Sequence, residues 1–244
     1  MWVKRGGKNN CTYSGTYFNL TVTKLIGSMQ KELTNPAIIQ FLKKKFKSAG
    51  FIDSLKIKYR SLICPFIPLI QMINPGEKVG DVGCGSGQFL LLLSEFAQPS
   101  YMYGIEISAR LIENANRLFN TLPHKNYKFE EYDGVHFPPT LGDLDVIYLI
   151  DVLHHVPSKN QRQFLKDLVG IMKPGARLVL KDINASSLLV YANKLHDLVF
   201  AREIGNEISI TVAASLLREF GLQIIEQSKR TMYVYPHYTI VAKK

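Results

Sequence analysis

From Lys78 onward the chain alternates short apolar runs with amphipathic stretches, and this alternation restricts the fold more than any other feature. Apolar runs of strand length predict β-strands at 78–82, 101–105, 127–130, 145–150 and 177–182. The stretches between these runs predict helices at 88–97, 109–118 and 160–172. Because parallel strands need a crossover connection, usually a helix, this order predicts a doubly wound α/β sheet.

The last part of the chain predicts a different kind of pairing. A helix is expected at 211–220, before Gly221, and two strands at 222–225 and 232–242 are expected to be joined by the polar turn 227–230. Strands joined by a short turn pair antiparallel, so an antiparallel pair is expected to close the sheet. Pro236 lacks an amide hydrogen, which suggests a bulge or an edge position in the last strand.

The N-terminal third differs from the rest, and we divide the chain at 74/75. Residues 1–33 show no helical period, whereas helices are predicted from 35 to about 50, at 53–62 and at 65–73. Residues 1–77 hold 12 Lys and Arg against 3 Asp and Glu, a net +9; residues 78–244 hold 18 against 17, a net +1, which completes the total of +10. The expected domains are a basic helical extension at 1–74 and an α/β domain at 75–244.

The basic run Lys43-Lys44-Lys45-Phe46-Lys47 leaves three interpretations open. It is a solvated helix face, a surface for peripheral contact with an anionic membrane, or an RNA-binding surface. The apolar side chains interleaved with the lysines favour the membrane over RNA. Nucleic acid is the least favoured partner, because no known nucleic-acid motif accompanies the charge.

Composition excludes several classes of protein. No run approaches the ~20 apolar residues needed to span a bilayer, and no apolar segment follows the basic start at 1–8, as a signal peptide would require. Cys11, Cys64 and Cys84 are odd in number and far apart, which argues against a disulfide framework and against a cysteine metal site. A reducing, cytoplasmic location is therefore expected.

The first predicted strand ends at Asp81-Val82 and runs directly into the loop Gly83-Cys84-Gly85-Ser86-Gly87 and then a helix. Glycines permit a tight turn and let a ligand approach the backbone, and the start of a helix offers unpaired N–H groups. A dinucleotide fingerprint requires its third glycine where this chain has Gln88. Asp81, two residues before the first glycine, instead suits a cationic ligand that carries an ammonium and a sulfonium group.

Acidic residues also follow the second and third predicted strands. Glu106 ends the second strand, where a carboxylate is placed to accept hydrogen bonds from two ribose hydroxyls. Asp133-Gly134 follows the third strand. Its carboxylate either accepts a hydrogen bond from an adenine amino group or forms an ordinary turn.

These residues, followed in order by Asp151-Val152-Leu153-His154-His155-Val156-Pro157 and Met172-Lys173-Pro174-Gly175, resemble the class I S-adenosylmethionine-dependent methyltransferases over about residues 75–244. The segment from Asp151 is similar to the branch that modifies small molecules and quinones. The resemblance implies a Rossmann-like sheet of seven strands with the last strand antiparallel, and S-adenosylmethionine as cofactor. It implies cofactor contacts at Asp81, Gly83, Cys84, Gly85, Gly87, Glu106, Ile107, Asp133, Gly134 and Asp151.

Two adjacent histidines are the candidates for catalysis. Methyl transfer from a sulfonium depends largely on alignment, and a base is needed only where the acceptor must lose a proton. His154 and His155 follow the fourth strand, and each is either a general base or a packed residue at a helix start. A metal site is not expected, because adjacent side chains point apart and no third ligand is apparent.

The acceptor pocket is expected to involve residues 184–207, an insertion that the resemblance implies as a cover for substrate. Tyr191 and His196 in this insertion, Tyr59 and Arg60 before the first strand, and His237 in the last strand are the candidate substrate residues. The N-terminal extension is expected to pack over the same site. The resulting hypothesis is methyl transfer from S-adenosylmethionine to a small-molecule or lipid-linked acceptor. An RNA methyltransferase and a catalytically silent cofactor-binding protein are the alternatives.

Overall fold

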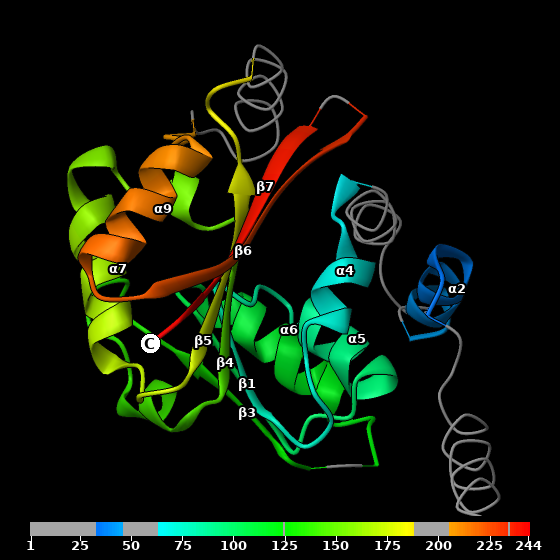
Figure 1. The fold of residues 1–244 in the computed structure, drawn as a ribbon. Helices are drawn as coiled ribbons and strands as arrows, with labels where there is room; N and C mark the ends of the chain where they lie inside the picture. Colours follow the sequence, from blue (N-terminus) through cyan, green and yellow to red (C-terminus); the bar gives the residue numbers. More distant parts are fainter. Residues whose placement is uncertain (1–32, 46–62, 124, 188–204, 234) are drawn as a thin grey trace, which may run out of the picture. The chain divides into compact units, whose positions relative to one another are not determined.

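The computed structural model describes residues 33–45, 63–123, 125–187, 205–233 and 235–244 (Figure 1). The lead-in at 1–32 and the helix expected at 53–62 lie outside these ranges. In chain order the described elements are α2 (Asn35–Lys45), α4 (Phe66–Gln71), β1 (Lys78–Val82), α5 (Gln88–Phe96), β2 (Tyr101–Glu106), α6 (Ala109–Phe119), β3 (Tyr127–Glu131), η1 (Pro139–Asp143), β4 (Val146–Ile150), η2 (Leu153–His155), α7 (Ser158–Ile171), β5 (Arg177–Ile183), α9 (Ile210–Glu219), β6 (Gln223–Met232) and β7 (Tyr235–Lys243).

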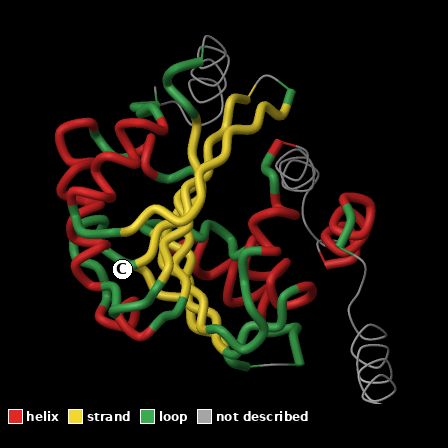
Figure 2. The backbone as a smooth tube through the Cα atoms, in the orientation of Figure 1, coloured by secondary structure: helices red, strands yellow, loops and turns green. Residues whose placement is uncertain are grey.

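The described strands form one seven-stranded sheet in the order β3-β2-β1-β4-β5-β7-β6. Figure 2 shows the strands gathered in one layer with helices on both sides. β1 pairs in parallel with β2 and β4, β2 with β3, and β4 with β5, whereas β7 runs antiparallel to β5 and β6. The predicted doubly wound sheet with an antiparallel last strand is confirmed. The central strand β4 matches its apolar run most directly, because burial on both faces demands a continuous apolar sequence.

Helices cover both faces of the sheet, so the core has two layers. α4, α5 and α6 pack on one face, and α7 and α9 on the other (Figure 1). Side chains of β4 alternate between the layers: Tyr148 and Ile150 pack on the side of α5, and Ile147 and Leu149 on the side of α7. All five residues of β4 are buried, which makes β4 a rigid support for the loop that follows it.

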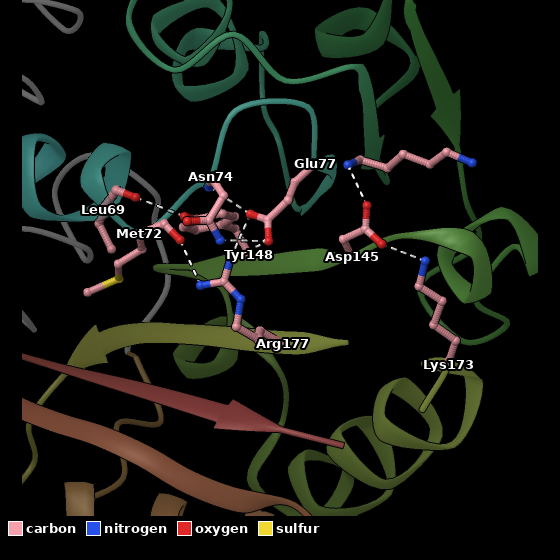
Figure 3. Close-up of polar contacts among 9 residues, drawn as sticks. Leu69, Met72, Asn74, Glu77, Asp145, Tyr148, Lys173 and Arg177 are labelled. Carbon is pink, nitrogen blue, oxygen red and sulfur yellow. Dashed lines mark hydrogen bonds and ion pairs between the residues drawn. The ribbon is translucent and has the colours of Figure 1, made fainter. Parts of the chain in front are cut away.

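A polar network ties the amino ends of the central strands together (Figure 3). Arg177, at the start of β5, donates to both carboxylate oxygens of Glu77, at 2.8 and 2.6 Å. Asp145 accepts from the backbone N–H of Lys78 at 2.8 Å and from Nζ of Lys173 at 2.6 Å. These contacts fix the amino ends of β1, β4 and β5, and the carboxyl ends lie at the opposite edge of the sheet.

α2 packs in the same core layer as α4 and α5. Ile38 and Leu42 are buried, and Phe41 meets Phe96 of α5 edge-on with ring centroids 5.8 Å apart. The apolar side chains of α2 are thus used for packing within the domain, while Lys43 is exposed. The division at 74/75 stays a prediction, as does membrane contact. None of the helices described has the length and apolar character required to cross a membrane.

The closing hairpin differs from the expectation. Residues 227–230, predicted as the turn, lie inside β6. The prediction was wrong because β6 is an edge strand with mostly exposed side chains, so its polar sequence resembles a loop. Pro236 lies in a strand with two neighbours, and the bulge is in β6 between Ile224 and Glu226. The proline is tolerated because β5 ends opposite His237, so no further β5 residue requires an N–H from Pro236.

Candidate functional site

The strand order reverses at β1, whose two neighbours are β2 and β4. In open α/β sheets, ligands bind outside the carboxyl ends of the strands at such a switch point. The loops that carry the candidate cofactor residues follow the carboxyl ends of β1, β2, β3 and β4. The topology therefore brings these loops to one edge of the sheet.

The loop after β1 adopts a tight conformation that depends on glycine. Gly83, Gly85 and Gly87 have φ values of 75°, 55° and 76°, in the left-handed region that other residues rarely adopt. The N–H groups of Gly83 and Cys84 both donate to the Ile105 carbonyl of β2, at 2.8 and 3.0 Å. The end of β2 thus fixes where the loop begins.

The carboxylate of Glu106 connects the ends of β1 and β2. Its Oε2 accepts from the N–H of Gly85 at 3.0 Å, and its Oε1 accepts from the N–H groups of Ile107 and Ser108 at 2.9 and 3.3 Å. Two carboxylate oxygens offer about four acceptor positions, so these bonds leave capacity for a ligand hydroxyl. Glu106 lies beside the glycine loop and holds its middle residue in place.

Asp81, just before the end of β1, and Cys84, just after it in the chain, are both buried. Asp81 is 3% exposed and lies opposite Gly104 in β2 and Tyr148 in β4. The thiol of Cys84 is buried as well and donates to the Gly85 carbonyl at 3.6 Å. A Cβ at Gly104 would lie 2.8 Å from the sulfur of Cys84, so the glycine in β2 makes room for the thiol. The side chain of Cys84 is used for packing.

The loop after β3 is a turn built around the carboxylate of Asp133. Its Oδ1 accepts from the N–H groups of His136 and Val135 at 2.7 and 2.8 Å, and its Oδ2 lies 2.6 Å from Nδ1 of His136. Donation from the His136 backbone and ring holds the pKa of Asp133 well below its usual range. Gly134 has φ 82°. The nearby Ile107 is 63% exposed and lends the turn an apolar flank.

Asp151 follows β4 with φ 55°, a conformation that costs a residue other than glycine roughly 1–3 kcal/mol. Its N–H donates to the Lys181 carbonyl at 2.9 Å, and its Oδ1 accepts from Nζ of Lys181 at 2.5 Å. Lys181 is fully buried, whereas the side chain of Asp151 keeps 26% exposure. The next residue, Val152, reaches the β1 loop, because a Cβ at Gly83 would lie 2.4 Å from its Cγ2.

His154 and His155 lie in η2 and have different surroundings. His154 is 4% exposed; its Nδ1 lies 2.5 Å from Oδ1 of Asp182, and its N–H donates to Oδ2 at 3.1 Å. The same Oδ1 accepts from the N–H of Ile183 at 2.7 Å. His155 is exposed, and its ring centroid lies 4.1 Å from that of His154. Asp182 therefore fixes the side chain of His154 in a buried position, whereas His155 has access to solvent.

His237, in β7 opposite Ile183, is 3% exposed. Its Nε2 lies 2.8 Å from the carbonyl oxygen of Ile63. Among the described residues its Nδ1 has no hydrogen-bond partner. Burial and the positive charge of Lys181 lower the pKa of His237 to about 4, so the ring is neutral near neutral pH.

Two charged residues of this region escaped the sequence interpretation. Lys181 and Asp182 follow the apolar run 178–180 near the carboxyl end of β5, which was the available signal. Buried charges need partners, and a lysine and an aspartate in a buried strand therefore mark the loops that supply those partners.

Four candidate substrate residues lie outside the described residues: Tyr59, Arg60, Tyr191 and His196. They stay predictions. Within the described ranges, no group of three or more His, Cys, Asp or Glu side chains is arranged to hold a metal ion.

Comparison with known proteins agrees with this arrangement. Residues 55–227 match a family model described as a methyltransferase domain. The chain is 27% identical over 179 residues to 27-O-demethylrifamycin SV methyltransferase of Amycolatopsis mediterranei, and the aligned region covers 70% of this chain and 63% of that protein. It is 32% identical over 115 residues to 2-methyl-6-phytyl-1,4-hydroquinone methyltransferase of a Synechocystis strain, which covers 47% of this chain and 35% of that protein. The chain thus spans less than two thirds of the length of both relatives.

The fold also matches solved structures. Magnesium protoporphyrin IX methyltransferase from Synechocystis PCC 6803, solved with bound SAH, superposes with a TM-score of 0.58 at 19% identity, covering 93% of this chain and 96% of that one. At this identity the likeness shows the fold alone. The family model covers most of the chain, and the sheet has the expected strand order. The chain therefore belongs to the methyltransferase-domain family, among the class I S-adenosylmethionine-dependent methyltransferases.

Proposed function

We propose that the protein transfers a methyl group from S-adenosylmethionine to a small-molecule or lipid-linked acceptor. The observation that carries this proposal is the Glu106 carboxylate, which joins the left-handed glycine loop to the end of β2 and keeps acceptor capacity for a hydroxyl group. One relative is named for a demethylrifamycin and another for a phytyl hydroquinone, a ring with a lipid tail. Both names support an acceptor of this class.

The described residues fit the cofactor. The glycines of the β1 loop let the methionine part approach the backbone, and the buried acid Asp81 lies at the start of that loop. Glu106 would hold the ribose, and the exposed Ile107 beside Gly134 would cover the adenine ring. When bound, the cofactor supplies an activated methyl group, and the protein has to align the acceptor and exclude water.

The other site assignments belong to the same proposal. The backbone of Cys84, the Asp133 turn and Asp151 would complete the cofactor contacts. Of the two adjacent histidines, His155 is exposed and accessible to an acceptor, whereas His154 is held by Asp182. A cytoplasmic location is part of the proposal, and the buried thiols of Cys64 and Cys84 support it.

Calorimetric titration with S-adenosylhomocysteine tests the cofactor site. Glu106→Ala removes the ribose acceptor, and hydrogen bonds to charged groups are worth about 1.5–3 kcal/mol, so affinity should fall about tenfold to a hundredfold. Glu113→Ala is the matched control, because Glu113 is an exposed carboxylate on α6 that pairs with the exposed Arg117. Undiminished affinity in Glu106→Ala would remove the basis of the proposal.

Transfer of a radiolabelled methyl group separates the competing functions. The purified protein is incubated with labelled cofactor and with small-molecule, lipid and total RNA fractions in parallel. Label in the small-molecule or lipid fraction supports the proposal, and label in the RNA fraction supports the RNA alternative. Cofactor binding without label in any fraction favours a catalytically silent binding protein.

A further inference from the structure

The ring of His237 has a defined tautomer. Its Nε2 lies 2.8 Å from the backbone carbonyl oxygen of Ile63, and a carbonyl oxygen only accepts hydrogen bonds. Nε2 therefore carries the hydrogen, and in the neutral ring Nδ1 carries a lone pair. This nitrogen is an acceptor and lacks a partner within the described residues.

A buried acceptor without a donor is unfavourable. The ring is 3% exposed, so bulk water does not compensate for the missing hydrogen bond. Leaving such a group unsatisfied costs about 1–3 kcal/mol, and groups of this kind call for a specific explanation. Since Nε2 is already used by Ile63, only Nδ1 is left to accept a further hydrogen bond.

His237 lies close to the residues that end β4 and β5. Its strand partner in β5 is Ile183, two residues after Lys181, so His237 and Lys181 are diagonal neighbours on one face of the sheet. Lys181 contacts Asp151 at 2.5 Å, and Val152 reaches the position of Gly83. His237 thus lies on the sheet face that carries Lys181, whose partner Asp151 directly precedes the residue that reaches the glycine loop.

We propose that Nδ1 of His237 accepts the hydroxyl hydrogen of the methyl acceptor and takes the proton as that oxygen is methylated. The inference rests on the proposed function, and it names the acceptor class as a hydroxyl compound. The O–CH₃ bond forms while the S–CH₃ bond of the cofactor breaks, with the electron pair of that bond passing to sulfur. The proton moves from the oxygen to Nδ1, and the imidazolium passes it to water that enters as the methylated product leaves.

The charges around the ring favour a neutral hydroxyl over a cationic amine. Burial of the ring and the positive charge of Lys181 lower the pKa of His237, so a positive charge at Nδ1 is disfavoured. An alkylamine carries such a charge at neutral pH, whereas an alcohol or phenol does not. A weak base suffices here, because a hydroxyl becomes strongly acidic as its oxygen gains a methyl group.

Binding of matched ligands tests the inference without turnover. α-Naphthol and α-methylnaphthalene have similar shapes, and only the naphthol carries a hydroxyl hydrogen. In the presence of S-adenosylhomocysteine, wild type should bind the naphthol about fivefold to tenfold more tightly, as expected for one buried hydrogen bond. His237→Gln places an amide N–H near the position of Nε2, which keeps the donor for Ile63 and removes Nδ1, so this preference should disappear.

Nitrogen NMR of histidine-labelled protein reads Nδ1 directly. Naphthol should move the Nδ1 resonance of His237 and leave Nε2 in place, and α-methylnaphthalene should move neither. Arg230→Gln is the control variant, because Arg230 is the exposed β6 partner of His237 and should retain the full naphthol preference. An equal preference in wild type and His237→Gln, or an unmoved Nδ1 resonance in saturated protein, would overturn the inference.

The same two proteins separate this inference from the proposed function. Methylation of α-naphthol by wild type, with about a hundredfold or greater loss in His237→Gln and unchanged cofactor affinity, supports both. Methylation that survives His237→Gln refutes the role of His237 alone. Absence of methyl transfer to any acceptor, with the Nδ1 shift intact, refutes the proposed function and leaves the hydroxyl site standing.

Discussion

Acidification should destabilise the protein through His237, and replacing this residue should remove the effect. The pKa of His237 is about 4 in the folded protein, against 6.5 for an ordinary histidine, because the ring is buried and faces Lys181. As pH falls below 6.5, the unfolded chain takes up a proton that the folded protein does not bind until about pH 4. The stability that comes from the neutral buried ring is therefore complete above 6.5 and is lost as pH falls toward 4.

The size of the effect follows from the two pKa values. They differ by about 2.5, and each pKa unit corresponds to about 1.4 kcal/mol, so the full loss is about 3 kcal/mol. About 2 kcal/mol of this should be lost between about pH 7 and about pH 5. The groups around the ring are Lys181 and Asp182 of β5, Asp151 after β4, and Tyr235 of β7.

Urea unfolding followed by far-ultraviolet circular dichroism measures the loss. Wild type and His237→Gln are unfolded at several pH values in the same buffer, and the free energies of unfolding are subtracted. The free energy of unfolding of wild type minus that of His237→Gln should decrease by about 2 kcal/mol from about pH 7 to about pH 5. Because other titrating groups are common to both proteins, they cancel in the difference. Parallel pH profiles for the two proteins would refute the argument.

Three further changes have defined outcomes. Gly83→Ala places a methyl group 2.4 Å from Val152 on a residue with φ 75°, so thermal unfolding should show a loss of stability of about 1–3 kcal/mol. Adding Val152→Ala should restore part of this stability, and a single variant as stable as wild type would contradict the loop geometry. Asp151→Asn removes the carboxylate that pairs with the fully buried Lys181, so the free energy of unfolding should fall by about 3–5 kcal/mol. Lys181→Met leaves only a partly exposed carboxylate and should cost less, so chemical unfolding of both variants checks this order, and the reverse order would contradict it. Tyr238→Phe removes a buried hydroxyl that has no partner within the described residues, so the melting temperature should stay the same or rise, and a clear fall would show that the hydroxyl is bonded.

Much of the fold was readable because burial leaves a direct mark on sequence. β4 packs on both faces, and its sequence is accordingly continuous in apolar residues. The edge strand β6 was not readable in the same way. Its side chains are largely exposed, so no apolar pattern was required, and residues 227–230 were predicted as a turn when they pair with β7.

The residues of the candidate site also differ in whether local sequence patterns reveal them. Residues next to each other in the chain, such as the glycine loop and its acid Asp81, were found because local spacing dictates their conformation. Lys181 and Asp182 were missed because their roles depend on partners about thirty residues away, Asp151 and His154. Nothing in the local sequence of either pair specifies which loop the sheet places beside it.

The sequence by itself determined the alternation of strands and helices, the position of the glycine loop and the acidic residue at the end of each of the first strands, because each is a local pattern of burial, turn geometry or charge. Only the tertiary structure decided that Glu106 holds Gly85, that Asp182 fixes His154, and that His237 keeps a buried, unpartnered Nδ1 beside Lys181. These contacts join strands that are distant in the chain, and their geometry depends on strand register and order, which a single sequence does not encode in any local segment.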